Sequence, residues 1–408
     1  MVSKGRDAKT LQIYQADRGS TDKMVAELDL SSEKDSIKNA WFTGVKTILT
    51  LSRSQMSGYE LPSGKLIFQL PASQPSASFL DYQPALSADR RYVVCSSDRG
   101  LDVRLTADGS VACELKVSDL HKNIGSMAFS NDSKRLAVLT RLGVEIFDME
   151  SGKPLQQVCV NKLRGQIRWI NSGLVLCGHK VVSLDTSEVV WEYGRFAKSP
   201  FFDGPDLGWV VGATKDRQKV LQRHSIPEPG VLKTIEAFEK EQPVMLSAGD
   251  QVDIEIVGDE KHLLGLEDDL VTGLKASLKE AGYDVVSGAK AKIVVTISPP
   301  AKGHFDEIGI ENGDNYIETR KYNYKALLQL ESNGQKRTIR SIQIGTQAMD
   351  YAIDWSVENP QAEFEQNWKA ELVRRITGMP FPDRFVEPSS GPLGTTRIDW
   401  DGKLTTTK

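Results

Sequence analysis

The sequence predicts a mainly β fold: a β-propeller of six or seven blades, complete or lacking part of its N-terminal blade, followed by a small α+β domain. Three observations support this. Gly64, Gly109 and Gly152 stand in similar polar turns, 45 and 43 residues apart. Short apolar runs typical of strands surround each turn. The rhythm stops near residue 240, where an amphipathic helix pattern begins. A period near 40 with about four strands per unit is typical of propeller blades.

The clearest unit begins at Met127 with MAFS, RLAVLT, GVEIFD and PLQQVCV, which we expect to be four strands. Comparable runs occupy residues 36–70, 80–118 and 164–195. Residues 199–237 fit less well, with KVLQRHS and VLKTIEA as their last two expected strands. Before all of these, LQIYQA and MVAELDL in residues 11–30 resemble the last two strands of a blade.

Ring closure is left open by this pattern, because five and a half units would expose strand edges that folded proteins avoid. One solution is a truncated or divergent N-terminus. The other pairs PVMLSAG and VDIEIVG, at residues 243–258, with the incomplete first blade. VDIEIVG can instead be the first strand of the next domain, which fits the sequence order better.

The predicted domains are a propeller at residues 1–240, an α+β domain at 241–385 and a tail at 386–408. Leucines four residues apart predict a helix that Gly282 ends. A hairpin with an Asn-Gly turn follows at residues 322–345. The last helix, at 364–376, is expected to bury one apolar face. These two helix faces consist of Leu266, Leu270, Leu274 and Leu278, and of Trp368, Leu372 and Ile376.

Composition and charge exclude several classes of protein. The net charge of −4 divides into +2 for residues 1–250 and −6 for 251–408, so neither part indicates nucleic acid binding. No apolar run is long enough to span a bilayer, and the N-terminus lacks a signal-peptide core. We therefore expect a cytoplasmic protein, or a periplasmic one if an upstream signal segment is missing. Each of the four cysteines lies in an apolar run and is expected to be a structural core residue: Cys95, Cys113, Cys159 and Cys177.

Two sequence features carry a family resemblance. SADRRYVV from Ser87 and SNDSKRLAV from Ser130 lead into second strands, and ADGS or xSGK turns follow third strands. In these features residues 9–237 resemble the WD40-like and quinoprotein-like β-propellers, of the bacterial type followed by a C-terminal α+β module. No Trp-Asp dipeptide ends a third strand and no Gly-His pair opens a unit. The resemblance therefore implies the propeller architecture and no catalytic or cofactor residues.

A candidate binding site emerges from the alignment of the units. The position just after the second strand carries a positive or protonatable side chain in five of them: Arg53, Arg99, Arg141, His179 and Lys215. In a propeller these turns open on one face around the central channel. They would present a ring that binds an acidic protein segment or an anionic ligand.

The sequence favours a non-catalytic scaffold for protein–protein interaction. Its expected partner is a protein, and an acidic segment of that protein is one candidate for the part that binds. The alternative is a propeller enzyme, a hydrolase or lyase with its active site in the central channel. That reading requires converging carboxylates, histidines or metal ligands, and the five histidines stand at no metal-ligand spacing. We therefore predict no catalytic residues, no metal, no cofactor, no nucleic acid and no membrane.

Overall fold

The computed structural model describes the following residues: 2–4, 10–15, 23–29, 37, 39–52, 55–71, 84–97, 100–117, 124–140, 143–160, 163–194, 201–202, 208–213, 219–258, 265–298, 309–312, 315–318, 324–344, 357, 359–378, 380–389, 391–398 and 404–407. The chain divides into two compact units, which are described separately. Unit 1 comprises Met1–Val117, His121–Val138 and Asp148–Lys153, and unit 2 comprises Ser118–Leu120, Leu139–Phe147 and Pro154–Lys408.

The chain is mainly β, with several antiparallel sheets and three helices among the described residues. Three sheets have four strands each, and a six-stranded sheet begins with four more; within each set the strands follow the sequence order. Sheet 1 consists of β4 (Asn39–Phe42), β5 (Thr47–Leu51), β6 (Gln55–Glu60) and β7 (Leu66–Pro71); sheet 2 of β8 (Ala85–Leu86), β9 (Tyr92–Ser97), β10 (Gly100–Leu105) and β11 (Val111–Leu115); sheet 3 of β12 (Ser126–Phe129), β13 (Arg135–Thr140), β14 (Gly143–Asp148) and β15 (Pro154–Val158); sheet 4 of β16 (Ile167–Trp169), β17 (Leu174–Cys177), β18 (Lys180–Ser183) and β19 (Glu188–Tyr193).

Several smaller sheets are also present among the described residues. The N-terminal sheet has three strands, β1 (Val2–Lys4), β2 (Thr10–Gln15) and β3 (Lys23–Asp29), of which β2 and β3 are the two expected from the sequence. Residues 199–237 form β20 (Phe201–Phe202), β21 (Gly208–Ala213) and β22 (Lys219–His224). Two-stranded sheets pair β23 (Val244–Ser247) with β31 (Arg384–Val386) and β27 (Gly309–Asn312) with β28 (Asn315–Glu318).

Sheets 1 to 4 share one turn geometry between their third and fourth strands. A residue with positive φ stands in each turn, and a β-bulge follows three residues later in the fourth strand. The left-handed positions are Gly64 (φ +69°), Gly109 (+76°), Gly152 (+69°) and Ser187 (+53°). The bulged residues are Ile67, Ala112, Leu155 and Val190. The N-terminal sheet has a bulge between Ile13 and Tyr14, which aligns Met24 with Leu66 and Val111.

In unit 1 the last strand of each sheet packs against the third-to-fourth-strand turn of the next sheet. A Cβ atom on Gly109 would lie 2.7 Å from Phe68 Cδ2 and 3.1 Å from Leu70 Cδ1. Gly64 meets Leu28 of the N-terminal sheet in the same way, at 3.3 Å. Gly152 meets Leu115, at 3.7 Å. All three glycines supply the left-handed backbone, and Gly109 and Gly64 also leave the space in which the preceding sheet packs.

The two serine motifs of the resemblance form matching turns. Ser87 Oγ donates to Asp89 Oδ1 at 2.6 Å and accepts from the Tyr92 N–H at 2.9 Å. Ser130 Oγ donates to Asp132 Oδ1 and accepts from the Arg135 N–H at the same distances. Each aspartate also accepts a backbone N–H two residues on. Burial acts to raise the pKa of Asp89, but the hydrogen bonds outweigh it, and the pKa of both carboxyl groups is lowered.

Sheet 4, in unit 2, is covered by helix α1 (Pro229–Glu241). The expected strand VLKTIEA lies in this helix, so that prediction is wrong. Pro229 at the first helical turn is compatible with a helix start, and Val231 and Ile235, four residues apart, bury one face of the helix. Both side chains belong to the apolar cluster that includes Trp191 and Ile226.

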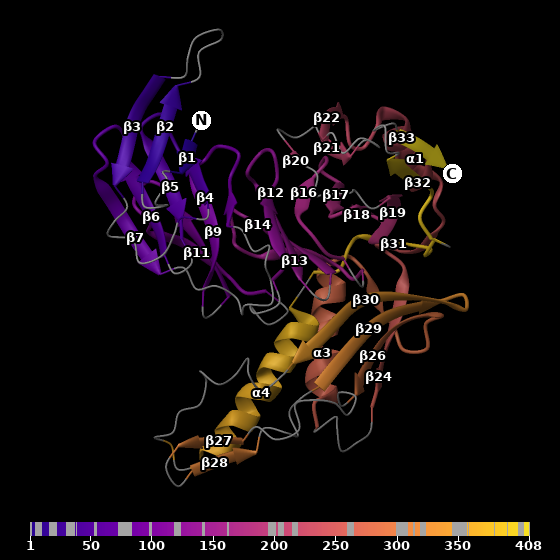
Figure 1. Ribbon diagram of the computed structural model, residues 1–408. Coiled ribbons are helices and arrows are strands. Elements are labelled where there is room, and N and C mark those ends of the chain that lie inside the picture. The colour runs from indigo at the N-terminus through magenta and orange to yellow at the C-terminus, as the bar shows by residue number, and fades with distance from the viewer. Residues whose placement is uncertain are drawn as a thin grey trace. The chain divides into compact units, whose positions relative to one another are not determined.

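The remainder of unit 2 contains a five-stranded sheet with two helices. Its order is β25–β24–β26–β29–β30, with bounds Asp284–Val285, Gln251–Val257, Ala291–Ser298, Tyr324–Ser332 and Gln335–Ile344. Helices α3 (Glu267–Glu280) and α4 (Pro360–Thr377) lie beside one another (Figure 1) and share its core. The expected leucine, tryptophan and isoleucine faces are buried there, and Gly282 has φ +87°. VDIEIVG forms β24 of this sheet, so its use in ring closure is wrong.

The C-terminal segment adds two strands to sheet 4. β32 (Thr395–Ile398) pairs in parallel with β19, and β33 (Leu404–Thr407) pairs antiparallel with β32. The order of this sheet is therefore β16–β17–β18–β19–β32–β33. No helix among the described residues has the length and apolar character needed to cross a bilayer.

Candidate functional site

Of the five residues of the predicted ring, only His179 is among the described residues. It is half-buried in the short turn between β17 and β18, and its carbonyl oxygen accepts a hydrogen bond from the Tyr193 N–H at 2.7 Å. The other four lie outside the described residues: Arg53, Arg99, Arg141 and Lys215. The ring therefore stays a prediction.

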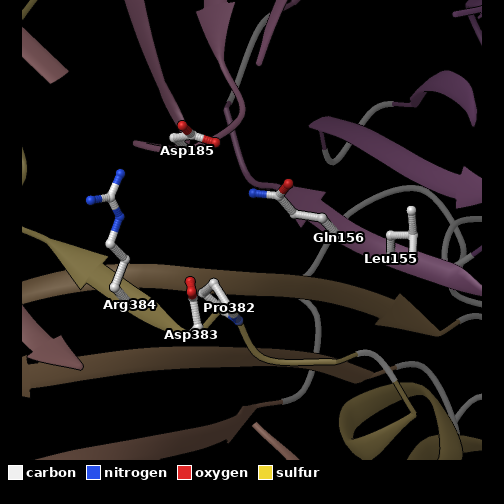
Figure 2. Close-up of a pocket in the computed structure, with 6 residues that line it drawn as sticks. All are labelled: Leu155, Gln156, Asp185, Pro382, Asp383 and Arg384. Atoms are coloured by element: carbon white, nitrogen blue, oxygen red, sulfur yellow. The ribbon is translucent and has the colours of Figure 1, made fainter. Parts of the chain in front are cut away.

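A cavity of about 350 Å³ opens in unit 2 beside the turn between β18 and β19. Three segments far apart in the sequence line it: the start of β15, the β18–β19 turn and the start of β31. Figure 2 shows Asp185 and Arg384 on one side and the Gln156 amide directed between the strands, whereas Leu155 points away. The lining residues are Leu155, Gln156, Asp185, Pro382, Asp383 and Arg384.

The β18–β19 turn is held in place by side chains from three other elements. Gln156 Nε2 donates to the Leu184 carbonyl oxygen at 2.5 Å. The buried Arg337 of β30 donates to the carbonyl oxygens of Thr186 and Val386. Ser183 Oγ donates to Glu239 Oε1 of α1 at 2.5 Å. These bonds fix the position of Asp185 at the edge of the cavity, because its neighbours on both sides are anchored.

The charges around the cavity are mainly acidic. Burial raises the pKa of Glu239, and the nearby Asp185 adds to this effect, while the bond from Ser183 and the charge of Arg384 oppose it. Asp185, Asp383 and Arg384 are exposed. Burial lowers the pKa of Arg337, and the charge of Glu188 opposes that shift. The cavity is therefore suited to a polar or cationic group, which the carboxylates would attract.

The cysteines fit the structural role expected of them in part. All four are free; Cys95 and Cys177 are buried, whereas Cys113 and Cys159 are partly buried. Burial raises the pKa of Cys95 to about 11 and that of Cys159 to about 12, so both remain thiols at neutral pH. Within the ranges that the structure describes, no three histidine, cysteine or acidic side chains are grouped to hold a metal ion.

Unit 1 carries a second candidate surface, the exposed apolar row, which consists of Met24, Leu66 and Val111. The row occupies equivalent positions on β3, β7 and β11, directly before the bulge of each strand. These side chains are 49%, 45% and 45% exposed, respectively. Because all three stand at one register of successive sheets, the row is the second candidate for a binding surface.

Sequence reasoning missed both surfaces. Gln156, Asp185 and Arg384 meet only through tertiary packing, and no local motif connects them. The exposed apolar row did have a signal, since each member follows its turn by a fixed distance. No protein-family model matches the chain, and no curated protein shows significant similarity to it.

Proposed function

We propose that this chain is a non-catalytic scaffold for protein–protein interaction, built on a WD40-like propeller in the cytoplasm. Support for the propeller comes from the shared turn and bulge of sheets 1 to 4. In unit 1, the last strand of each sheet also packs against the turn of the following sheet. Both features are those of a series of similar blades arranged side by side.

The exposed apolar row carries the interaction proposal. Isolated apolar residues on a surface need no explanation, but these three occur at one register of three successive sheets. Phe68 and Leu70, further along β7, face the next sheet instead and supply the packing that holds the sheets together. The row is not required for that packing, so a partner protein that covers it explains its apolar character.

The experiment compares two triple variants of the full chain. The row variant replaces Met24, Leu66 and Val111 by serine. The control variant replaces three exposed polar residues of the same strands by serine, each three positions further along: Glu27, Gln69 and Glu114. Both are used as tagged baits in extracts of the native cell, with chemical crosslinking and quantitative mass spectrometry, after thermal melting has shown that both are folded.

We expect proteins retained by the wild type and by the control variant to be lost, at least tenfold, from the row variant. If the row variant retains the same proteins in the same amounts, the proposal is wrong.

A further inference from the structure

The C-terminal segment is bound along β19 as a ligand peptide would be. The Leu393 N–H donates to the Val190 carbonyl at 3.0 Å, the Glu192 N–H to the Gly394 carbonyl at 3.2 Å, and the Gly194 N–H to the Thr396 carbonyl at 2.6 Å. The first bond is donated by the C-terminal segment and the other two by Glu192 and Gly194, so the segment pairs in parallel with β19 as a strand added to a sheet edge does. This edge is therefore a surface that accepts an extended chain.

Side chains give the pairing a sequence requirement. A Cβ atom on Gly394 would lie 2.5 Å from Trp191 Cη2 and 2.7 Å from the Thr407 carbonyl oxygen, so only glycine fits. Thr396 Oγ1 accepts a hydrogen bond from the buried Trp191 Nε1 at 3.1 Å. Leu393 packs against the apolar cluster of sheet 4 and α1. The recognised pattern is leucine–glycine–any residue–threonine.

The contact between Trp191 and Gly394 joins segments that are far apart in the sequence. Trp191 follows the bulge of β19 as Phe68 follows the bulge of β7. Phe68 packs against Gly109, which belongs to the turn of the next sheet. At Trp191 the glycine is Gly394, about two hundred residues away in sequence. The aromatic ring is thus packed against a glycine in both places, but at Trp191 this glycine comes from a distant part of the chain.

We propose that the groove along β19, with Trp191 as its floor, binds an extended leucine–glycine–any residue–threonine segment in trans, and that the ligand is the C-terminal segment of a second copy of this chain. The three backbone bonds and the Trp191 contacts involve only residues 393–396 and their hairpin, so a second copy makes the same ones. Exchange of identical segments costs little for that reason. The chain's own segment competes at a high effective concentration, so trans binding is expected once that segment is released.

The test uses the full chain with Gly394→Val, whose own segment cannot occupy the groove. A fluorescent peptide of residues 387–408 represents the second copy's segment, and its binding is followed by fluorescence polarisation. The matched control peptide carries Gly394→Val. In a parallel arm, a specific protease site inserted at residue 390 of the otherwise wild-type chain is cut after folding, and exchange of the released segment for labelled peptide is measured.

We expect the wild-type peptide to bind the Gly394→Val chain at least tenfold more tightly than it binds the uncut wild-type chain, and the control peptide to bind neither. The cut chain should incorporate the wild-type peptide and not the control. Failure of the wild-type peptide to bind a folded Gly394→Val chain overturns the proposal. If that variant does not fold, the cut chain decides: no incorporation, or equal incorporation of both peptides, overturns it. The test is independent of the exposed apolar row.

Discussion

Replacement of Gly109 by alanine tests whether each sheet packs against the turn of the next. Gly109 has φ +76°, and a Cβ atom there would meet the Phe68 ring at 2.7 and 2.8 Å. The ring cannot swing away, because it lies against Gly58 on its other side, where a Cβ atom would approach it to 2.5 Å. Gly152 is the matched control, since it occupies the same turn position with φ +69° but has no neighbour closer than 3.7 Å.

The structure gives different magnitudes for the two variants. Left-handed backbone costs an alanine about 1–2 kcal/mol, and this applies equally to Gly109→Ala and Gly152→Ala. Overpacking against Phe68 adds about 1–3 kcal/mol in Gly109→Ala alone. We therefore expect Gly109→Ala to lower the local free energy of unfolding by about 1–3 kcal/mol more than Gly152→Ala does, which is roughly a 5- to 150-fold difference in the opening equilibrium.

Hydrogen exchange measured by mass spectrometry is a suitable assay, because it reads local opening in unit 1 without assuming a two-state transition of the whole chain. The peptide that covers β6 and β7 reports on Gly109→Ala. A second variant, Phe68→Leu, should shorten the side chain and remove most of the extra cost in the double mutant. Equal exchange in Gly109→Ala and Gly152→Ala, or no rescue by Phe68→Leu, would refute the packing argument.

Three further predictions follow from the site and the sequence. Arg337→Met should lower amide protection around the β18–β19 turn by about 2 kcal/mol, because two carbonyl oxygens lose their buried donor; unchanged protection in hydrogen exchange contradicts this. Glu239→Gln should stabilise the protein at neutral pH but not near pH 4, because the raised pKa of folded Glu239 means that only its ionised carboxylate destabilises the wild type, which loses stability as the pH rises through that pKa. Urea melts at several pH values test this, and a stability difference between variant and wild type that does not change with pH would contradict it. Replacing the predicted ring residues by glutamine, at Arg53, Arg99 and Arg141 together, should weaken binding of an acidic peptide at low salt, which unchanged polarisation titrations would contradict.

The sequence predicted the parts of the fold that depend on local periodicity. Leu270, Leu274 and Leu278 all face the core, because a spacing of four keeps them on one side of a helix. The strands of sheets 1 to 4 were found from their turns, since positive φ requires glycine at three of the four turn positions. Ser187 takes the fourth position with φ +53°, so that turn adopts the same geometry without a glycine.

The one error in element type shows where local patterns fail. In VLKTIEA, β-branched and apolar residues fit a strand as well as a helix in a short window. Two features favour the helix α1: Pro229 is compatible with its first turn, and its buried side chains pack on the apolar face of sheet 4. Val231 and Ile235 are buried on one face of α1, but residues four apart also share one face of a strand, so this pair could not separate the two structures.

Pairing between segments distant in the sequence could not be predicted at all, and it defines both sites of unit 2. Arg337 holds Thr186 across 151 residues, and Trp191 holds Thr396 across 205. The sequence around these four residues resembles that around ordinary surface or core residues, so it contains no sign of either contact. Gly394 is the exception in principle: a glycine beside threonines that enter a strand is unfavourable for the strand itself. Its presence there is explained by the close approach of the Trp191 ring, and this makes it the residue through which the C-terminal segment and sheet 4 are specific for one another.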